Sequence, residues 1–193
     1  MPIGLYFGSF NPIHVGHLII ANHVLNLNQI EQIWFVVTPQ NPFKPVKSLL
    51  NEFDRLHLVQ IAVENDFRLR ASDIEFTLPK PSYTSHTLAY LKENYPNREF
   101  TILMGSDSFQ NLPRWKNADQ IIKNYPILIY LRPGFSVEND HGAKATILEA
   151  PLLNISASEI RKLSAQGKSI KYLVPDVVEQ EIIKSRLYKA QNK

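Results

Sequence analysis

Two histidines lie three residues apart in the segment FGSFNPIHVGHLII, residues 7–20, and could bind an anion or a metal ion. An apolar run ends at Gly8 and helical spacing begins after His17, which is typical of a strand that turns into a helix. Glycine lets a ligand approach the backbone at Gly8 and Gly16, and the unpaired N–H groups at a helix start attract anions. If the helix includes His14, both imidazoles share one face and can donate to phosphate oxygens.

Metal binding is the weaker interpretation of this pair. Zinc proteases carry histidines four residues apart with a glutamate between them, whereas Val15 and Gly16 separate these two histidines. A second alternative has one histidine packed in the core and the other capping a loop. The remaining histidines are interpreted as structural: His23, His57, His86 and His141.

The loop TPQNPFKPVKS, residues 38–48, follows an apolar run and contains three prolines, which stiffen an extended backbone. Lys44 and Lys47 are the side chains in this loop that can reach an anion. Without further context the segment is interpreted as a surface loop.

The segment MGSDSFQNLPRWKN, residues 104–117, also follows an apolar run and has a glycine at its start. Asp107 can accept hydrogen bonds from sugar hydroxyls, or it can cap a following helix. Trp115 can offer a flat face to an aromatic ring or base, or it can pack in the core. The residues alone favour neither alternative.

The segment NISASEIRKL, residues 154–163, has the pattern of a helix start. Ser156 and Glu159 have the spacing of a capping box. The hydroxyls and N–H groups of such a start also suit a phosphate, and Arg161 can clamp a phosphate through two parallel hydrogen bonds.

The elements that must position these residues alternate in type along the chain. Short apolar runs rich in β-branched and aromatic residues predict buried strands at 3–7, 32–37, 100–104 and 125–131. Helical periodicity predicts helices at 16–27, 52–64, 84–94 and 116–124. Further strands are expected within 68–84 and 144–154, followed by a helix pair at 156–166 and 176–187.

This alternation predicts an α/β fold with a Rossmann-like doubly wound parallel sheet, helices on both faces and a C-terminal helical segment. Ligands bind such sheets beyond the carboxyl ends of the strands. Because no linker divides the sequence, we expect a single domain over residues 1–193, with its C-terminal helical part at about residues 155–190.

The composition narrows the class of protein. The 193 residues are 44% hydrophobic and 20% charged, as in ordinary folded domains. The absence of cysteine excludes disulfides and thiolate chemistry and agrees with a reducing compartment. The net charge of +3 is scattered and suits a small anionic ligand, so no nucleic acid is expected. No apolar run approaches the roughly 18 residues of a membrane span. We therefore expect a cytoplasmic protein without a membrane partner.

Taken together, these segments resemble the nucleotidyltransferase superfamily with the HxGH signature, in FGSFNPIHVGH and in ISASEIR near the C-terminus. Within that superfamily, NPFK, PSYTSHTL, GSDSFQNLPRWK and LRPGF resemble the bacterial nicotinate-nucleotide adenylyltransferases. The resemblance extends from about residue 3 to about residue 188, and five ordered motifs are more specific than any single one.

The resemblance implies a reaction in which the 5′-phosphate of nicotinate mononucleotide attacks the α-phosphorus of ATP. The products are nicotinate adenine dinucleotide and pyrophosphate. A phosphate monoester is an adequate nucleophile, so catalysis consists of positioning and charge stabilisation. Mg²⁺ is expected on the ATP phosphates rather than in a metal site of the protein.

The resemblance also implies roles for individual residues. His14, His17, Lys44 and Arg161 are expected to be catalytic, with His17 stabilising the transition state. The expected ATP-binding residues are Gly8, Ser9, Phe10, Gly16, Gly105, Asp107, Ser156 and Ser158. Those expected to bind the nicotinate nucleotide are Asn41, Thr84, Trp115 and Arg132.

The sequence departs from the usual family pattern in several places. Phe7 precedes Gly8 where a second glycine is usual, Asn11 replaces an aspartate, and Phe43 replaces a histidine before the loop lysine. ISAS also stands where ISST is usual. We expect the chemistry to survive these changes, while the roles of positions 11 and 43 stay open.

Three alternatives to this function are kept. The acceptor could be nicotinamide mononucleotide or phosphopantetheine, with the same chemistry. The chain could instead be a catalytically silent nucleotide-binding module, although its full set of phosphate donors argues against that. A metal-dependent hydrolase built on the histidines lacks carboxylate partners. A homo-oligomer stays open as well.

Overall fold

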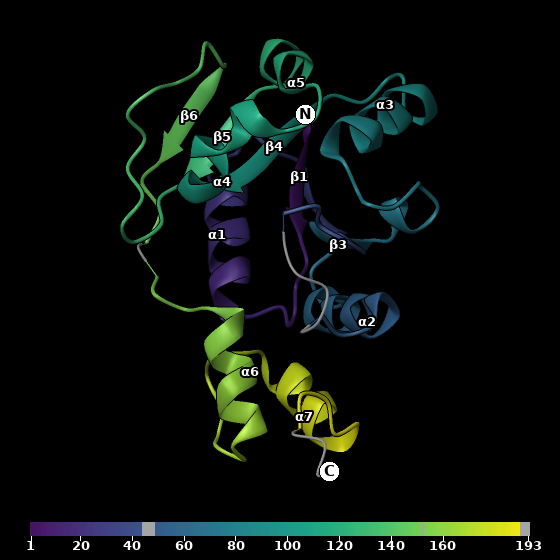
Figure 1. Ribbon diagram of the computed structural model, residues 1–193, viewed down its shortest axis with the longest axis vertical. Helices are drawn as coiled ribbons and strands as arrows, with labels where there is room; N and C mark the ends of the chain where they lie inside the picture. Colours follow the sequence, from purple (N-terminus) through teal and green to yellow (C-terminus); the bar gives the residue numbers. More distant parts are fainter. Residues whose placement is uncertain (44–48, 152, 190–193) are drawn as a thin grey trace.

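A six-stranded parallel sheet forms the centre of the computed structural model, which describes residues 1–43, 49–151 and 153–189. The strand order is β3-β2-β1-β4-β5-β6, so the chain order reverses between β1 and β4 (Figure 1). The strands are β1 (Ile3–Gly8), β2 (Gln32–Val37), β3 (Leu69–Ser72), β4 (Phe100–Gly105), β5 (Ile127–Tyr130) and β6 (Ala145–Leu148). The expected doubly wound α/β fold is confirmed.

Except for α4, the helices follow the predicted periodic segments to within a few residues at each end. They are α1 (Val15–Asn26), α2 (Glu52–Val63), α3 (Thr84–Asn94), α4 (Ser106–Gln110), α5 (Ala118–Asn124), α6 (Ala157–Ala165) and α7 (Asp176–Lys184). Two 3₁₀ turns, η2 (Ile74–Phe76) and η3 (Leu112–Arg114), complete the described elements. The sequence did not predict α4, η2 or η3, because such short elements show no clear periodicity. In the described part of the chain, no helix combines the length and apolarity that crossing a membrane requires.

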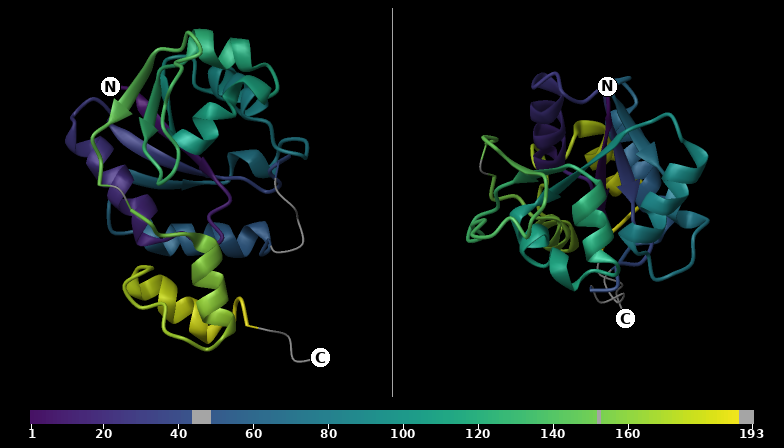
Figure 2. Two further views of the ribbon diagram at one scale, coloured as in Figure 1. Left: turned by 60° about the vertical axis from the view of Figure 1, so that its left-hand side comes forward. Right: turned by 90° about the horizontal axis from the view of Figure 1, so that it is seen from above.

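Each central strand is buried on both faces, because alternate residues enter two different apolar clusters. Leu5 of β1 lies in a cluster with Leu91 of α3. Its neighbour Tyr6 lies in the opposite cluster, with Val24 of α1 and Val59 of α2. The period of two along a strand therefore places α1 and α2 on one face and α3 on the other (Figure 2).

The C-terminal helices α6 and α7 lie beyond the sheet, next to the turn where β1 leads into α1 (Figure 1). Val178 and Ile182 of α7 are buried in the same cluster as Leu58 of α2. The Val15 N–H donates to the carbonyl of Leu173 at 3.0 Å. The first turn of α1 is therefore held against the segment that joins α6 to α7.

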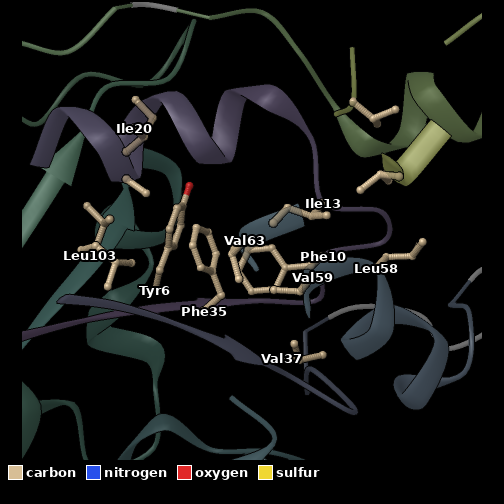
Figure 3. Packing of buried hydrophobic residues seen from close by; sticks show 14 of the residues in the cluster. Tyr6, Phe10, Ile13, Ile20, Phe35, Val37, Leu58, Val59, Val63 and Leu103 are labelled. Carbon is tan, nitrogen blue, oxygen red and sulfur yellow. The ribbon is translucent and has the colours of Figure 1, made fainter. Parts of the chain in front are cut away.

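Three aromatic side chains support the turn after β1. Tyr6, Phe35 and Phe10 follow one another beneath α1 (Figure 3), with ring centroids 5.5 Å apart in both the Tyr6–Phe35 and Phe10–Phe35 pairs. Phe10 has a φ of 43°, which is unusual for a bulky side chain, while its ring is only 3% exposed. Core packing of the ring fixes this strained backbone and with it the path of the turn.

Candidate active site

Two cavities open at the carboxyl ends of β1 and β4, where the strand order reverses. We call the cavity of about 400 Å³ that His14, His17 and Arg161 line the histidine cavity. The tryptophan cavity, of about 140 Å³, is lined by Trp115 and Thr84 among others. The two share a wall made of Phe7, Gly8, Ser9, Asp107 and Ser108. Doubly wound sheets bind ligands at this position.

His14 and His17 lie together in the histidine cavity, but not for the reason that their spacing suggested. The helix begins at Val15, and His14 precedes it with an extended backbone, φ −144°. The two imidazoles are instead stacked, with ring centroids 3.7 Å apart and an interplanar angle of 23°. The His14 N–H donates to Nδ1 of His17 at 3.2 Å. Because Nδ1 of His17 accepts this bond, the ring proton of its neutral form lies on Nε2.

His14 is only 4% exposed, and burial lowers its pKa to about 4, with a smaller contribution from the positive charge of Arg132. It is therefore neutral at physiological pH. Its Nδ1 has no hydrogen-bond partner among the described residues. Gly16 is needed beside it, because a Cβ at position 16 would lie 3.0 Å from this nitrogen.

Arg161 reaches the histidine cavity from α6 and is held by two acceptors. Its Nη1 donates to the carbonyl of Asn11 at 2.8 Å, and its Nη2 donates to Oγ of Ser158 at 3.3 Å. Ser156 caps α6 as the spacing predicted, since its Oγ accepts from the Glu159 N–H at 3.2 Å. Ser156, Ser158 and Arg161 therefore face the histidine pair, as expected for one phosphate site.

Arg132 lies apart from the other residues that are expected to bind the nicotinate nucleotide. It lines the histidine cavity, whereas Trp115 lines the tryptophan cavity. Its Nη1 forms an ion pair with Oδ2 of Asp107 at 3.1 Å. Gly105 leaves room for this pair, because a Cβ there would lie 2.5 Å from Oδ1 of Asp107. The guanidinium of Arg132 thus lies in the same cavity as His14, His17 and Arg161, paired with a residue of the wall that the two cavities share.

Asn11, whose role the sequence left open, is a buried junction. Its Oδ1 accepts from the Tyr188 hydroxyl at 2.9 Å and from the Leu50 N–H at 3.3 Å. Its backbone carbonyl accepts from Arg161 at 2.8 Å. This asparagine therefore joins the turn after β1 to both α6 and the C-terminal segment.

Arg55 supports the site from beneath and was not identified from the sequence. It is 0% exposed, and within the part of the chain that the structure describes its guanidinium donates to four backbone carbonyls. These belong to Ser9 at 2.6 Å, Thr38 at 2.8 Å, Leu50 at 2.9 Å and Pro39 at 3.0 Å. The Arg55 side chain thus fixes the loops after β1 and β2. The sequence does not indicate this role, because a polar residue is ordinary in an amphipathic helix.

The tryptophan cavity combines one aromatic wall with polar groups. Trp115 is half-buried, and the Thr84 backbone begins α3 at the same cavity. Asn41 also lines it, together with Phe43, whose side chain is exposed. The expected nicotinate residues Asn41, Thr84 and Trp115 are therefore together, and Phe43 joins them. Lys44, expected to face the phosphates, lies outside the described residues.

The described residues contain no group of three or more histidine or acidic side chains arranged to hold a metal ion. The histidine cavity has instead N–H and O–H donors from neutral and cationic side chains. Among its described lining residues the acidic one is Asp107, which already pairs with Arg132. This set of donors suits phosphate oxygens.

The cytidylyltransferase-like family matches residues 5–163 of this chain. A protein of Cytophaga hutchinsonii described as a probable nicotinate-nucleotide adenylyltransferase is 48% identical, with 97% of this chain and 98% of that protein covered. A protein of Flavobacterium johnsoniae with the same description is 45% identical, with 98% and 100% covered.

A solved structure is also similar to this chain over nearly its whole length. The Plasmodium falciparum nicotinic acid mononucleotide adenylyltransferase complexed with NaAD matches with a TM-score of 0.83 and 26% identity. The alignment covers 97% of each chain. The fold of this chain is therefore that of a solved protein to which it is similar over nearly its whole length.

Proposed function

This chain belongs to the cytidylyltransferase-like family and, within it, to the nicotinate-nucleotide adenylyltransferases, and we propose that it joins ATP to nicotinate mononucleotide. The products are nicotinate adenine dinucleotide and pyrophosphate, in a step of NAD biosynthesis. The observation that carries the proposal is the pair of cavities that meet at Gly8 and Ser9. One offers donors for a triphosphate, and the other offers an aromatic wall for a pyridine ring.

The reaction needs little covalent chemistry from the protein. An oxygen of the mononucleotide 5′-phosphate forms a bond to the α-phosphorus of ATP, and the bond from that phosphorus to the bridging oxygen of pyrophosphate breaks. The wall that the two cavities share includes Gly8 and Ser9, and we place the meeting point of the two phosphates there. Such positioning replaces a bimolecular encounter with a reaction inside one complex.

Negative charge develops on the α-phosphate and on the leaving pyrophosphate, and the hydrogen-bond donors of the histidine cavity stabilise it. We assign the Nε2–H of His17 to the α-phosphate, because its Nδ1 is already occupied by the His14 N–H. Arg161 with the hydroxyls of Ser156 and Ser158 suits the β- and γ-phosphates. Donors held in place before the reaction cost no reorganisation in the transition state.

Arg132 and Asp107 extend this assignment. Arg132 adds a second guanidinium to the phosphate side, and its pair with Asp107 keeps it directed there. Gly105 ends β4 and Asp107 lies in the first turn of α4, and by the resemblance we assign both to the adenosine of ATP. We assign Lys44, by resemblance alone, to the phosphates as well.

We further propose that Mg²⁺ enters with ATP. It would neutralise phosphate charge and assist departure of pyrophosphate. The residues present fit this arrangement, because the histidine cavity supplies donors for phosphate and water-coordinated metal rather than a set of carboxylates. The protein's own contribution is to orient the phosphates and exclude bulk water.

The test is to incubate the protein with ATP and Mg²⁺ and follow pyrophosphate release with each acceptor. Nicotinate mononucleotide should give release, and the dinucleotide product should appear in equal amount. Faster release with nicotinamide mononucleotide or phosphopantetheine would show that this compound, and not nicotinate mononucleotide, is the preferred acceptor. Release without an acceptor would indicate hydrolysis, and no release with any acceptor would favour the silent binding module.

A further inference from the structure

A tyrosine near the C-terminus contacts the turn that leads from β1 to the histidines. The Tyr188 hydroxyl donates to Oδ1 of Asn11 at 2.9 Å, although 177 positions separate the two residues in the sequence. Asn11 is only 5% exposed, and Tyr188 packs against the apolar cluster that contains Val178 and Ile182 of α7. The C-terminal segment therefore meets the turn at a buried, hydrogen-bonded contact.

The end of α7 directs Tyr188 to this turn. The Arg186 N–H donates to the carbonyl of Ile183 at 3.3 Å. The Leu187 N–H donates to the carbonyl of Ile182 at 3.0 Å. This pair of bonds is a Schellman motif, which reverses the chain at a helix end. Arg186 and Tyr188 have φ values of 53° and 61°, a region that favours glycine. Such strain persists only where the surroundings hold it, and the packed ring and bonded hydroxyl of Tyr188 do so.

Asn11 connects Tyr188 to Arg161. Its backbone carbonyl accepts from Nη1 of Arg161 at 2.8 Å. The beginning of the same turn is held separately, since Nη1 of Arg55 donates to the carbonyl of Ser9 at 2.6 Å. With Ser9 held on one side and the Asn11 side chain on the other, the peptide between them and Arg161 has one orientation. The direction of the Arg161 guanidinium depends on it.

The contacts of Arg161 leave its charge available. Burial raises the pKa of Tyr188, and the positive charges of Arg161 and Arg55 oppose this rise without cancelling it. The phenol is therefore a neutral donor at physiological pH. Among the described residues, Arg161 donates to the Asn11 carbonyl and the Ser158 hydroxyl, which are neutral as well. Two of its five N–H groups are used in this way, and the guanidinium lines the histidine cavity.

We propose that Tyr188 is a positioning residue of the phosphate site. Its hydroxyl fixes Asn11, and Asn11 directs Arg161 toward the β- and γ-phosphates of ATP. The inference rests on the function proposed above, which assigns Arg161 to those phosphates. Tyr188 is not one of the described residues that line the two cavities, so it acts through Asn11 and not on the substrate.

The experiment compares the affinities for ATP and AMP by calorimetric titration without an acceptor. AMP lacks the β- and γ-phosphates, so its affinity reports on the rest of the site. In Tyr188→Phe, the dissociation constant of ATP should rise about threefold to tenfold, the range for one lost hydrogen bond. That of AMP should change by less than about twofold. Equal weakening of ATP and AMP would overturn the inference, because a generally loosened site affects both nucleotides.

Tyr172→Phe is the matched control. It removes the same hydroxyl from the same part of the chain, where Tyr172 also has a positive φ, 66°, but is 78% exposed. Both dissociation constants should stay within about twofold of those of the unmodified protein. Tyr188→Phe keeps the packed ring, and thermal unfolding establishes that both variants fold.

A double-mutant cycle tests whether Tyr188 acts through Arg161. In an Arg161→Ala background, Tyr188→Phe should change the ATP affinity by less than about twofold, because the group that Tyr188 positions is gone. If Tyr188→Phe weakened ATP binding as much in this background as in the unmodified protein, Tyr188 would act elsewhere and the inference would be wrong.

These titrations require no turnover, which separates this inference from the proposed function. If ATP binds but no acceptor gives adenylyl transfer, the proposed function has failed, while the comparison of ATP with AMP still tests the position of Arg161. Unchanged ATP affinity in Tyr188→Phe contradicts the inference whether or not transfer occurs. Failure of the unmodified protein to bind ATP contradicts it too.

Discussion

The backbone N–H of His14 donates to Nδ1 of His17 at 3.2 Å, while the two imidazoles stack at 3.7 Å. The hydrogen bond places the ring proton of neutral His17 on Nε2, the atom that we assign to the α-phosphate. The stack buries His14 behind the His17 ring, in the space that Gly16 keeps open. The two histidines of the motif therefore differ. His14 is buried and packs against the ring of His17, and His17 is the one that we assign to the substrate.

His17→Ala should lower kcat for adenylyl transfer by at least about a hundredfold, the scale seen when one preorganised donor to developing charge is lost. Steady-state kinetics with saturating ATP and nicotinate mononucleotide measures it. His23→Ala, on the same helix, is the control and should change kcat by less than about threefold. A comparably small effect at His17 would show that another group meets the α-phosphate.

Trp115→Ala should raise KM for the mononucleotide more than KM for ATP, because loss of a stacking face affects one substrate only. Trp115→Phe keeps an aromatic face and should restore most of the affinity. The two KM values are measured with the other substrate saturating. Equal increases in both would contradict the assignment of this side chain to the pyridine ring.

Arg55→Ala should lower the free energy of unfolding by about 3 kcal/mol or more, because it leaves four carbonyls unpaired and opens a buried space. Urea unfolding followed by circular dichroism measures the loss. Arg70→Ala is the control: Arg70 is exposed over the Trp34 ring at 4.6 Å, so its loss should cost less than about 1 kcal/mol. Similar values for both variants would contradict a special role for Arg55.

His14 predicts a pH dependence of stability. Its folded pKa of about 4 lies below the ordinary value of 6.5, so the unfolded chain binds more protons between these two pH values. Its contribution is therefore complete above pH 6.5 and is lost as pH falls toward 4. The loss is on the order of 3 kcal/mol.

His14→Asn removes this titration, so its free energy of unfolding should fall less steeply between pH 6.5 and 4. Urea unfolding at several pH values compares the two proteins, and carboxylates that titrate in the same window cancel in the difference. Parallel curves would show that His14 is protonated as readily in the folded protein as in the unfolded chain.

Most elements of the fold could be predicted from local pattern. Leu5 and Tyr6 are both apolar because each faces a different layer of helices, so a continuous apolar run indicated a strand buried on both faces. The short helix α4 could not be predicted, since five residues are too few for a helical period. Ser156 could be recognised as a helix cap because its Oγ accepts from the Glu159 N–H, which is only three residues away in the sequence.

The candidate site divides in the same way. The sequence indicated the histidine pair, Arg161 and Trp115, because short motifs carry them. It did not indicate that Arg132 lies in the histidine cavity, paired with Asp107, while the other residues expected to bind the nicotinate nucleotide line the tryptophan cavity. Arg55 gave no signal, because its partners are backbone carbonyls, which every residue has.

The sequence by itself therefore determined the order of most strands and helices, the motifs expected to bind phosphate and the absence of thiol chemistry, all of which depend on residue types and near neighbours. Only the tertiary structure decided which motifs meet. Arg161 donates to the carbonyl of Asn11 across 150 residues, and Arg55 of α2 donates to carbonyls in the loops after both β1 and β2. Such contacts depend on how the sheet brings the ends of its strands together, and no local pattern records that arrangement.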